Sequence, residues 1–157
     1  MEVKEINIRY KSFASREELG ADDLELVEAS IKAIGGSYAP YSHFNVGAAV
    51  RLSDGTIVTG ANQENAAYPS GICAERTAMF SAGAQYPDCK MVSIAIAASQ
   101  GGELCESPAA PCGACRQVMA QYQTKAGTPM SVLLAGREVV LKFDRVNDLL
   151  PFIFDNI

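Results

Sequence analysis

Two short stretches organise this chain: CAERTA at residues 73–78 and PCGACRQ at residues 111–117. Cys112 and Cys115 have the close spacing of a zinc-binding pair, which can place both sulfurs on one ion at the start of a helix. Cys73 offers a third thiol, and Glu75 follows two residues later. A structural zinc takes four protein ligands, whereas a catalytic zinc keeps one position open for water. Three thiols with a carboxylate beside them therefore predict a catalytic zinc site.

Four residues could supply the ligand that completes the close cysteine pair: Cys73, Cys89, Cys105 and His43. Cys73 is the best candidate because it precedes a run compatible with a helix and brings Glu75 with it. Two helix N termini that face one ion would help to hold three thiolates, since their free N–H groups favour negative charge. The remaining two cysteines fit small apolar core residues better than ligands. The alternative for the close pair is a redox dithiol.

The charge of such a site needs compensation. Zn²⁺ with three thiolates is net negative, so it acidifies a bound water less than a zinc held by neutral imidazoles, for which the pKa of the water reaches about 7. A guanidinium that donates to a ligand sulfur would withdraw negative charge. Arg76 and Arg116 are the cations next to the motif residues in sequence. We predict that Arg76 tunes the charge of the zinc.

Composition limits the classes of partner. The net charge of −5, with no cluster of Lys and Arg, disfavours nucleic acid, because non-specific binding depends on neutralising phosphates. No apolar stretch approaches the roughly 18 residues of a membrane span, and the start of the chain has no signal-peptide core. Five cysteines, an odd number, fit a reducing compartment. We therefore expect a cytoplasmic protein with a small-molecule partner and no membrane partner.

Hydrophobic periodicity predicts an α/β fold without internal repeats. Apolar residues spaced by three and four from Leu24 to Ile34 predict a helix that stops at Gly35-Gly36. Further helices are expected from Cys73 to about Ala84 and from Cys112 to about Tyr122. Strands are expected over residues 46–52, 56–60, 91–98, 130–134 and 138–143, and a last helical turn over residues 146–150. The continuous apolar run at 91–98 indicates a strand that is buried on both faces.

Signals are weaker at the two ends. Ile6, Ile8 and Tyr10 alternate with polar residues, as in a short edge strand or a flexible arm. Ser15 and Glu18 have the spacing of a capping box. We expect a single domain over residues 1–157, with residues 1–14 as an N-terminal arm and residues 151–157 as a C-terminal tail.

Further motifs flank the cysteines: YAPYSHF at 38–44, VGAA at 46–49, NQENA at 62–66 and YPSGI at 68–72. With these segments in order, the chain resembles the zinc-dependent cytidine deaminase family, in its small class with three cysteine ligands. The resemblance is good from about residue 37 to residue 123. It implies a three-layer α/β/α fold with a central mixed sheet of about five strands. It also implies one Zn²⁺ per subunit and a homotetramer with composite active sites.

The resemblance implies a reaction. Cytidine and deoxycytidine are hydrolysed to uridine and deoxyuridine with release of ammonia, as part of pyrimidine salvage. Cys73, Cys112 and Cys115 would hold the zinc, a zinc-activated water would attack C4, and Glu75 would be the catalytic proton carrier.

Four residues are implied to bind the substrate within one subunit. Asn62 and Glu64 match the clamp for the ribose 3′-hydroxyl, and a carboxylate there should repel a 3′-phosphate. Phe44 matches an aromatic residue that packs against the pyrimidine. Ala74 would bind the base carbonyl through its backbone N–H. Apart from the resemblance, these residues fit polar loop positions or core packing.

Two aromatic residues are implied to complete a site. Tyr68 resembles a residue that reaches from a neighbouring subunit, and a loop anchor is its alternative role. Phe154 matches an aromatic that closes a site, with Phe152 as a competitor. Ala110 departs from the family pattern, where Ser is usual before the Pro of the second motif, and little effect is expected.

Three other functions are compatible with some of these features. A deaminase of another cytosine-containing small molecule shares the same motifs. A non-catalytic, zinc-stabilised binding protein would not need Glu75. A polynucleotide editor is opposed by the negative charge of the chain and by Glu64.

Overall fold

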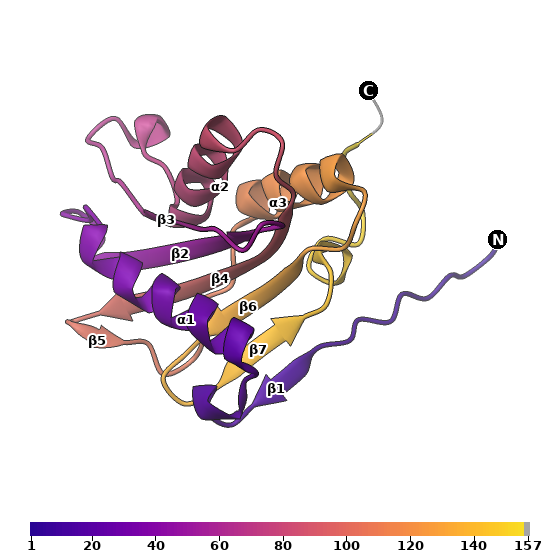
Figure 1. Cartoon of the computed structure of the whole chain (residues 1–157), viewed down its shortest axis with the longest axis horizontal. Coiled ribbons are helices and arrows are strands. Elements are labelled where there is room, and N and C mark those ends of the chain that lie inside the picture. Colours follow the sequence, from indigo (N-terminus) through magenta and orange to yellow (C-terminus); the bar gives the residue numbers. More distant parts are fainter. Residues whose placement is uncertain (156–157) are drawn as a thin grey trace.

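The computed structural model describes residues 1–155, which form a mixed sheet of seven strands with helices on both faces (Figure 1). The strand order is β1-β7-β6-β4-β2-β3, and β5 pairs with β4. β4 and β6 are parallel, and the other neighbours are antiparallel. The strands are β1 (Lys11–Phe13), β2 (Phe44–Leu52), β3 (Ile57–Ala61), β4 (Met91–Gln100), β5 (Glu103–Leu104), β6 (Ser131–Ala135) and β7 (Val140–Phe143).

Three α-helices cover this sheet in the described part of the chain. α1 (Ala21–Ala33) crosses one face, while α2 (Ala74–Gln85) and α3 (Gly113–Ala126) lie on the other (Figure 1). Short 3₁₀ turns occupy Arg16–Glu18, Ile34–Gly36, Tyr68–Ser70 and Val146–Asp148. Within residues 1–155, no helix combines the length and the apolar character that crossing a membrane requires.

Two hydrophobic cores hold the three layers together. Beneath α1, Leu26 and Val27 pack on small strand residues such as Ala49 and Ala95. Beneath α2 and α3, the side chains are larger; they include Leu52, Met79, Ile94, Ile96, Met119 and Met130. β4 contributes to both clusters, so the prediction that its apolar run is buried on both faces is confirmed.

The predicted three-layer α/β/α arrangement is confirmed, but the sheet has more than the expected five strands. The two additional strands are β1, with three residues, and β5, with two. Strands this short carry almost no periodic signal, and β1 is stabilised by pairing with β7 at the far end of the chain. The alternation from Ile6 to Tyr10 therefore suggested an edge strand slightly too early in the sequence.

The predicted capping box at Ser15 is wrong. The Ser15 side chain makes no capping hydrogen bond to the 3₁₀ turn that follows. The Glu18 carboxylate instead accepts from the backbone N–H of Ala14 at 3.0 Å. The helix predicted from Leu24 to Ile34 is confirmed as α1, and it ends in a 3₁₀ turn at the predicted glycine pair. Of the predicted C-terminal tail, residues 156 and 157 lie outside the described residues.

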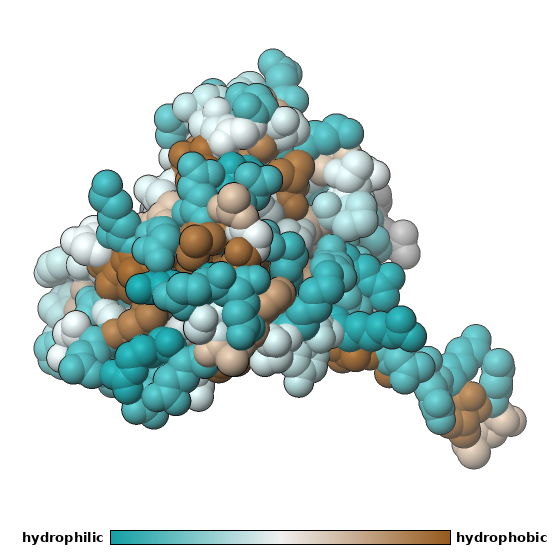
Figure 2. All heavy atoms as spheres, turned by 60° about the horizontal axis from the view of Figure 1, so that its bottom comes forward, coloured by the Kyte–Doolittle hydropathy of each residue, from teal (hydrophilic) through white to brown (hydrophobic). Residues whose placement is uncertain are grey.

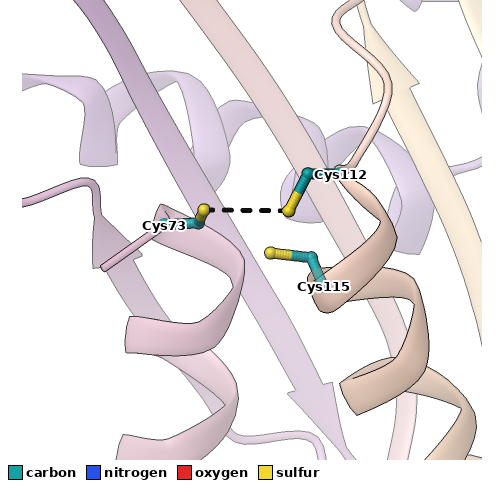
Figure 3. A group of neighbouring side chains, drawn as sticks. All are labelled: Cys73, Cys112 and Cys115. Atoms are coloured by element: carbon teal, nitrogen blue, oxygen red, sulfur yellow. Dashed lines mark hydrogen bonds between the residues drawn. The ribbon is translucent and has the colours of Figure 1, made fainter. Parts of the chain in front are cut away.

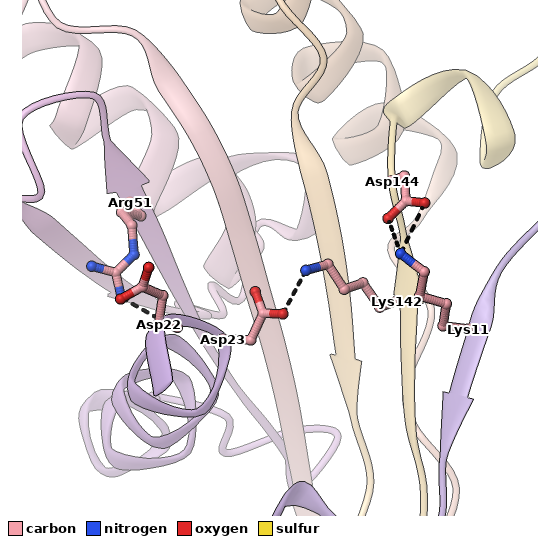
Figure 4. Close-up of polar contacts among 6 residues, drawn as sticks. All are labelled: Lys11, Asp22, Asp23, Arg51, Lys142 and Asp144. Carbon is pink, nitrogen blue, oxygen red and sulfur yellow. Dashed lines mark hydrogen bonds and ion pairs between the residues drawn. The ribbon is translucent and has the colours of Figure 1, made fainter. Parts of the chain in front are cut away.

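Ion pairs fasten the β1 edge of the sheet (Figure 4). Lys142 on β7 pairs with Asp23 in the first turn of α1. Lys11 on β1 pairs with Asp144 at 3.0 Å, just beyond the end of β7. The Lys142 and Asp23 side chains are mostly buried, whereas those of Lys11 and Asp144 are exposed. The first pair therefore contributes more to stability than the second.

Gly60 on β3 allows α2 to lie directly on the sheet. A Cβ atom at this position would lie 2.8 Å from the carbonyl oxygen of Ala74 and 2.9 Å from the Cβ of Thr77. Both neighbours belong to the first turn of α2, and one of them is backbone that cannot turn away. The position of the helix that begins after Cys73 thus depends on the absence of a side chain at residue 60.

We expect Gly60→Ala to lower the free energy of unfolding by about 1–3 kcal/mol, because the added methyl group overpacks the contact between β3 and α2. Urea denaturation followed by circular dichroism measures this change. Gly35→Ala is the matched control: nothing lies within 4 Å of its added Cβ, and a change below about 0.5 kcal/mol is expected. Equal stability of the two variants would contradict the prediction.

Candidate metal centre

The two cysteine motifs meet where two helices begin. Cys73 is the N-cap residue of α2, Cys112 is the N-cap residue of α3, and Cys115 lies in the first turn of α3. The three thiols point toward one another (Figure 3). Their sulfurs all lie within 4.8 Å of each other, and Cys73 Sγ is 3.9 Å from Cys112 Sγ. The choice of Cys73 as the third member of the group agrees with this geometry.

The spacing of the sulfurs fits a zinc ion. With Zn–S bonds of about 2.3 Å, two thiolates of a tetrahedral site lie roughly 3.8 Å apart. Cys89, Cys105 and His43 do not join the group; among the described residues, only the three motif cysteines form such a cluster. Three sulfur ligands leave the fourth tetrahedral position open, as in catalytic sites.

The surroundings of the thiols favour negative charge. The pKa of Cys73 is lowered to about 5, first because the thiol of Cys115 donates a hydrogen bond to it and further because Arg76 does. The pKa of Cys115 is raised, chiefly because this buried thiol is the donor in that contact. The free N–H groups and dipoles of the two helix N termini add to the stabilisation of thiolates.

Arg76, and not Arg116, lies against the sulfurs. Arg76 Nη2 donates to Cys73 Sγ at 3.6 Å. Its Nε is buried with no hydrogen-bond partner within residues 1–155. Arg116 turns away and donates to the carbonyl oxygens of Pro111 at 2.9 Å and Leu149 at 3.0 Å. Of the two cations considered from sequence, the structure thus brings one to the thiols and uses the other to hold the C-terminal segment on α3.

Glu75 lies in the first turn of α2 and is buried, with 5% of its surface exposed. Burial raises the pKa of its carboxyl above the ordinary value, and the negative charge of Cys73 adds to this effect. A carboxyl group whose pKa moves toward neutrality can accept a proton in one step and donate it in the next. The residue therefore has the environment of a proton carrier.

A cleft of about 510 Å³ borders the thiol cluster. It is lined by residues of the first cysteine motif and of the segments that precede it, among them Asn62, Glu64, Tyr68, Cys73 and Arg76. Its volume suits a small organic ligand. The structure thus brings five of the predicted site residues to one cavity.

Hydrogen bonds hold Glu64 from the loop that follows α1. Its carboxylate accepts from the backbone N–H groups of Tyr41 at 2.9 Å and Ser42 at 3.2 Å, and from the Ser42 hydroxyl. These bonds lower the pKa of Glu64, the Ser42 hydroxyl first, so the carboxylate stays ionised. Glu64 is an anchored negative charge at the wall of the cleft.

The side chain of Asn62 also holds separate segments of the fold together. Its Oδ1 accepts from the backbone N–H of Val46 at 2.8 Å and from the Ser37 hydroxyl at 2.5 Å. Its Nδ2 donates to the carbonyl oxygen of Phe44 at 2.9 Å. The side chain therefore ties the start of β2 to the loop after β3, in addition to facing the cleft.

Phe44 and Ala74 lie outside the lining of the cleft. Phe44 is the first residue of β2, half-buried and paired with Gln100 of β4. Ala74 is the buried first residue of α2, between Cys73 and Glu75. Tyr68 does line the cleft; the residue is 75% exposed, and its ring makes an edge-to-face contact with the ring of Tyr41, with centroids 6.0 Å apart.

The C-terminal segment is docked on α3. Gln117 Nε2 donates to the carbonyl oxygen of Phe154 at 2.7 Å, and Gln117 Oε1 accepts from the Phe154 N–H at 3.2 Å. Ile153 packs against the larger core, while Phe152 and Phe154 are exposed, the latter by 69%. This segment of the chain does not line the cleft.

Sequence reasoning missed the residues that support the site. Ser42 and Gln117 belong to motifs quoted above and Ser37 directly precedes one, but a polar residue in a loop or on a helix gives no sign of its partner. Gln117 contacts a residue 37 positions further along the chain. The one available signal for these supporting residues was that each lies in or next to a motif that also contains a predicted site residue.

Comparisons with known proteins agree with this geometry. Residues 21–128 match the family described as the cytidine and deoxycytidylate deaminase zinc-binding region. A cytidine deaminase from Halalkalibacterium halodurans is 40% identical over 131 residues, which cover 82% of this chain and 91% of that protein. The matched region contains both cysteine motifs and the residues of the cleft.

Solved structures give the same result. The crystal structure of cytidine deaminase from Burkholderia pseudomallei is 40% identical, with a TM-score of 0.66 over 83% of this chain and 97% of that one. The crystal structure of cytidine deaminase from Mycobacterium tuberculosis is 30% identical, with a TM-score of 0.65 over 84% and 96% of the two chains. The fold and family predicted from the sequence are confirmed.

We expect Arg76→Gln to weaken zinc binding by roughly 10- to 100-fold, the usual effect of removing a group that hydrogen-bonds a metal ligand. Competition with a chromophoric chelator measures the affinity. Arg137→Gln is the control, because that guanidinium pairs with Glu103 and Glu106 at the surface. If both variants bind zinc as tightly as the unaltered protein, Arg76 does not tune the site.

Proposed function

The chain belongs to the cytidine and deoxycytidylate deaminase family, and on this premise we propose that it hydrolyses cytidine and deoxycytidine to uridine and deoxyuridine, releasing ammonia. The observation that carries the proposal is a buried carboxyl, Glu75, in the first turn of the helix that Cys73 caps, beside three clustered thiols. The reaction belongs to pyrimidine salvage, and we assign it to the cytoplasm. We treat the whole chain as one deaminase domain.

In this proposal, Cys73, Cys112 and Cys115 would hold one Zn²⁺, which when bound would act as a Lewis acid and activate a water for attack on C4 of the base. Glu75 accepts the proton of that water. It would pass this proton to N3 of the ring, then take the second proton from the hydroxyl group added at C4 and pass it to the leaving amine. Burial supports this role, because a carboxyl with a raised pKa is a better proton donor than a solvated one and can still act as an acceptor.

Asn62 and Glu64 are proposed to bind the ribose. Glu64 is held by its bonds to Tyr41 and Ser42, so it can accept a hydrogen bond from the 3′-hydroxyl without first being ordered. Its ionised state would repel a 3′-phosphate. The proposed substrate is therefore a free nucleoside and not a polynucleotide.

Phe44 and Ala74 are proposed to bind the base. Ala74 offers its backbone N–H at the start of α2, where helix N–H groups have no partner within the helix. Phe44 is bonded through its carbonyl oxygen to Asn62, so the proposed base-packing residue and the ribose clamp belong to one hydrogen-bonded unit. Ala74 directly follows Cys73, which lines the cleft, and Phe44 is joined to the cleft residue Asn62 by this hydrogen bond.

A homotetramer with composite sites is proposed for the assembly. Large aromatic side chains are exposed at Tyr68, Phe152 and Phe154, so they are available for contacts between subunits. We propose that Tyr68 and Phe154 contact the substrate site of a neighbouring subunit. The Gln117 clamp on Phe154 supports this, because it holds the chain of the aromatic residue in one position on α3.

One assay tests the proposed function directly. The ultraviolet absorbance of cytidine falls as it is converted to uridine, and this loss is followed with purified protein before and after chelation of the metal. Turnover that stops on chelation and returns with Zn²⁺ supports the proposal. Turnover of another cytosine-containing compound, but not of free cytidine, would identify the deaminase of a different small molecule.

We expect Glu75→Gln to fold, to retain its zinc and to lose roughly 10²- to 10⁴-fold in kcat, because the amide cannot carry protons. Metal analysis and cytidine turnover are measured on the same sample. Glu138→Gln, at an exposed carboxylate, should behave as the unaltered protein. A non-catalytic zinc protein predicts that the function of the chain survives Glu75→Gln.

We expect Glu64→Gln to raise KM for cytidine by roughly tenfold or more, with a smaller effect on kcat, since a charged partner of the 3′-hydroxyl is lost. The variant should also discriminate less against cytidine 3′-monophosphate. Ser42→Ala is the matched control, because it removes one support of Glu64 and keeps the charge. Undiminished discrimination in Glu64→Gln would remove Glu64 from the ribose site.

A further inference from the structure

The start of the chain extends away from the body of the molecule (Figures 1 and 2). The matched family region begins at residue 21, so this extended segment, residues 1–10, precedes it. Within the described part of the chain, the backbone of residues 1–9 has no hydrogen-bond partner. Five large apolar side chains on it are exposed: Met1, Val3, Ile6 by 54%, Ile8 by 50% and Tyr10 by 59%.

The extended segment leads directly into an edge strand. β1 pairs with β7 on one side only, and it is the last strand in the described sheet. Tyr10, just before β1, stacks on Phe143 of β7 with ring centroids 5.4 Å apart. Because side chains alternate along a strand, Ile6, Ile8 and Tyr10 share one face. Residues 6–10 therefore have the pattern of a strand with one apolar face, while Val3 falls on the opposite face. In the described sheet, both this segment and β1 lack a neighbour on the outer edge.

We propose that this neighbour is the same segment of a second copy of the chain, antiparallel across a twofold axis at Asn7. In this register Glu5 lies opposite Arg9 of the other copy, and Ile6 lies opposite Ile8. Each pair occurs twice by symmetry. Opposite charges then meet on one face and apolar side chains on the other, which is the favourable arrangement for cross-strand pairs.

The charges of the segment select this register. Neither Glu5 nor Arg9 forms an ion pair with any residue in 1–155. A shift by two residues, with the axis at Ile8, would place Glu5 opposite Lys11. Lys11 is already paired with Asp144 at 3.0 Å, and Arg9 would then lie opposite an amide. The register centred on Asn7 gives both Glu5 and Arg9 a partner of opposite charge and leaves the pair of Lys11 and Asp144 intact.

This pairing would also cover the free edge of β1. The first residues of one copy would lie beside β1 of the other, so the two sheets would continue into one another through backbone hydrogen bonds. An exposed strand edge that is neither covered nor paired is an aggregation hazard. The interface goes beyond the proposed deaminase function, and cytidine turnover reports on that function separately.

Disulfide trapping tests the register. Directly opposite residues of an antiparallel pair have Cα atoms about 4.5–5.5 Å apart, within the range that a disulfide spans. Zinc-loaded Asn7→Cys, treated with a dipyridyl disulfide, is expected to form several-fold more covalent dimer than Lys4→Cys, which lies opposite Tyr10 and far from its own symmetry mate. Ile8→Cys should also give less dimer than Asn7→Cys. Dimer yields that are equal in Asn7→Cys and Lys4→Cys, or highest in Ile8→Cys, would overturn the proposal.

Charge reversal in the Asn7→Cys background gives a second test. Glu5→Arg or Arg9→Glu alone places like charges opposite one another twice, and each is expected to lower the dimer yield several-fold. The double variant restores opposite charges and should restore the yield. A double variant that remains as poor as the single ones would show that Glu5 and Arg9 do not face each other. Cytidine turnover should remain unchanged in every variant, because these residues lie outside the cleft.

Discussion

The meeting of two helix N termini at three thiols is the arrangement on which the rest of the site depends. α2 and α3 lie on the same face of the sheet, and each begins at a cysteine that acts as its N-cap residue. Sulfurs this close would repel one another as thiolates without compensation from helix dipoles, a cation and a metal. Packing beneath the helices, including the close contact at Gly60, holds their starts at the separation that a zinc ion bridges.

The ionisation of the charged side chains around this centre depends on how deeply each one is buried. Arg76 contacts the sulfur of the half-buried Cys73, while Glu75, the residue before Arg76 in the chain, is buried in an environment that opposes its ionisation. Two adjacent residues of one helical turn thus act in opposite senses: one stabilises anions on the metal side, and the other is kept ready to carry a proton. Glu64, in the wall of the cleft, is half-buried, and its hydrogen bonds lower its pKa and keep it ionised.

Much of this arrangement could be predicted from the sequence because its signals are local. Cys73, Cys112 and Cys115 have metal-ligand spacing within their motifs, and α1 to α3 have recognisable starts or periodicity. The short strands β1 and β5 could not be predicted, because their formation depends on pairing with β7 and on a tight reversal after β4. The side-chain partners of Asn62 and Gln117 were equally hidden, since a hydrogen bond to a distant backbone leaves no pattern in the sequence.

The bonds of Asn62 have a consequence for how this family can vary. One carboxamide joins the end of β3, the start of β2 and the loop at Ser37, and it also faces the cleft. Natural variants at this position will therefore be scarce, and those that arise will reduce the amount of folded protein in the cell before they alter any preference among sugars. Selection for a new ligand has more freedom at Glu64, whose supports are confined to one surface loop.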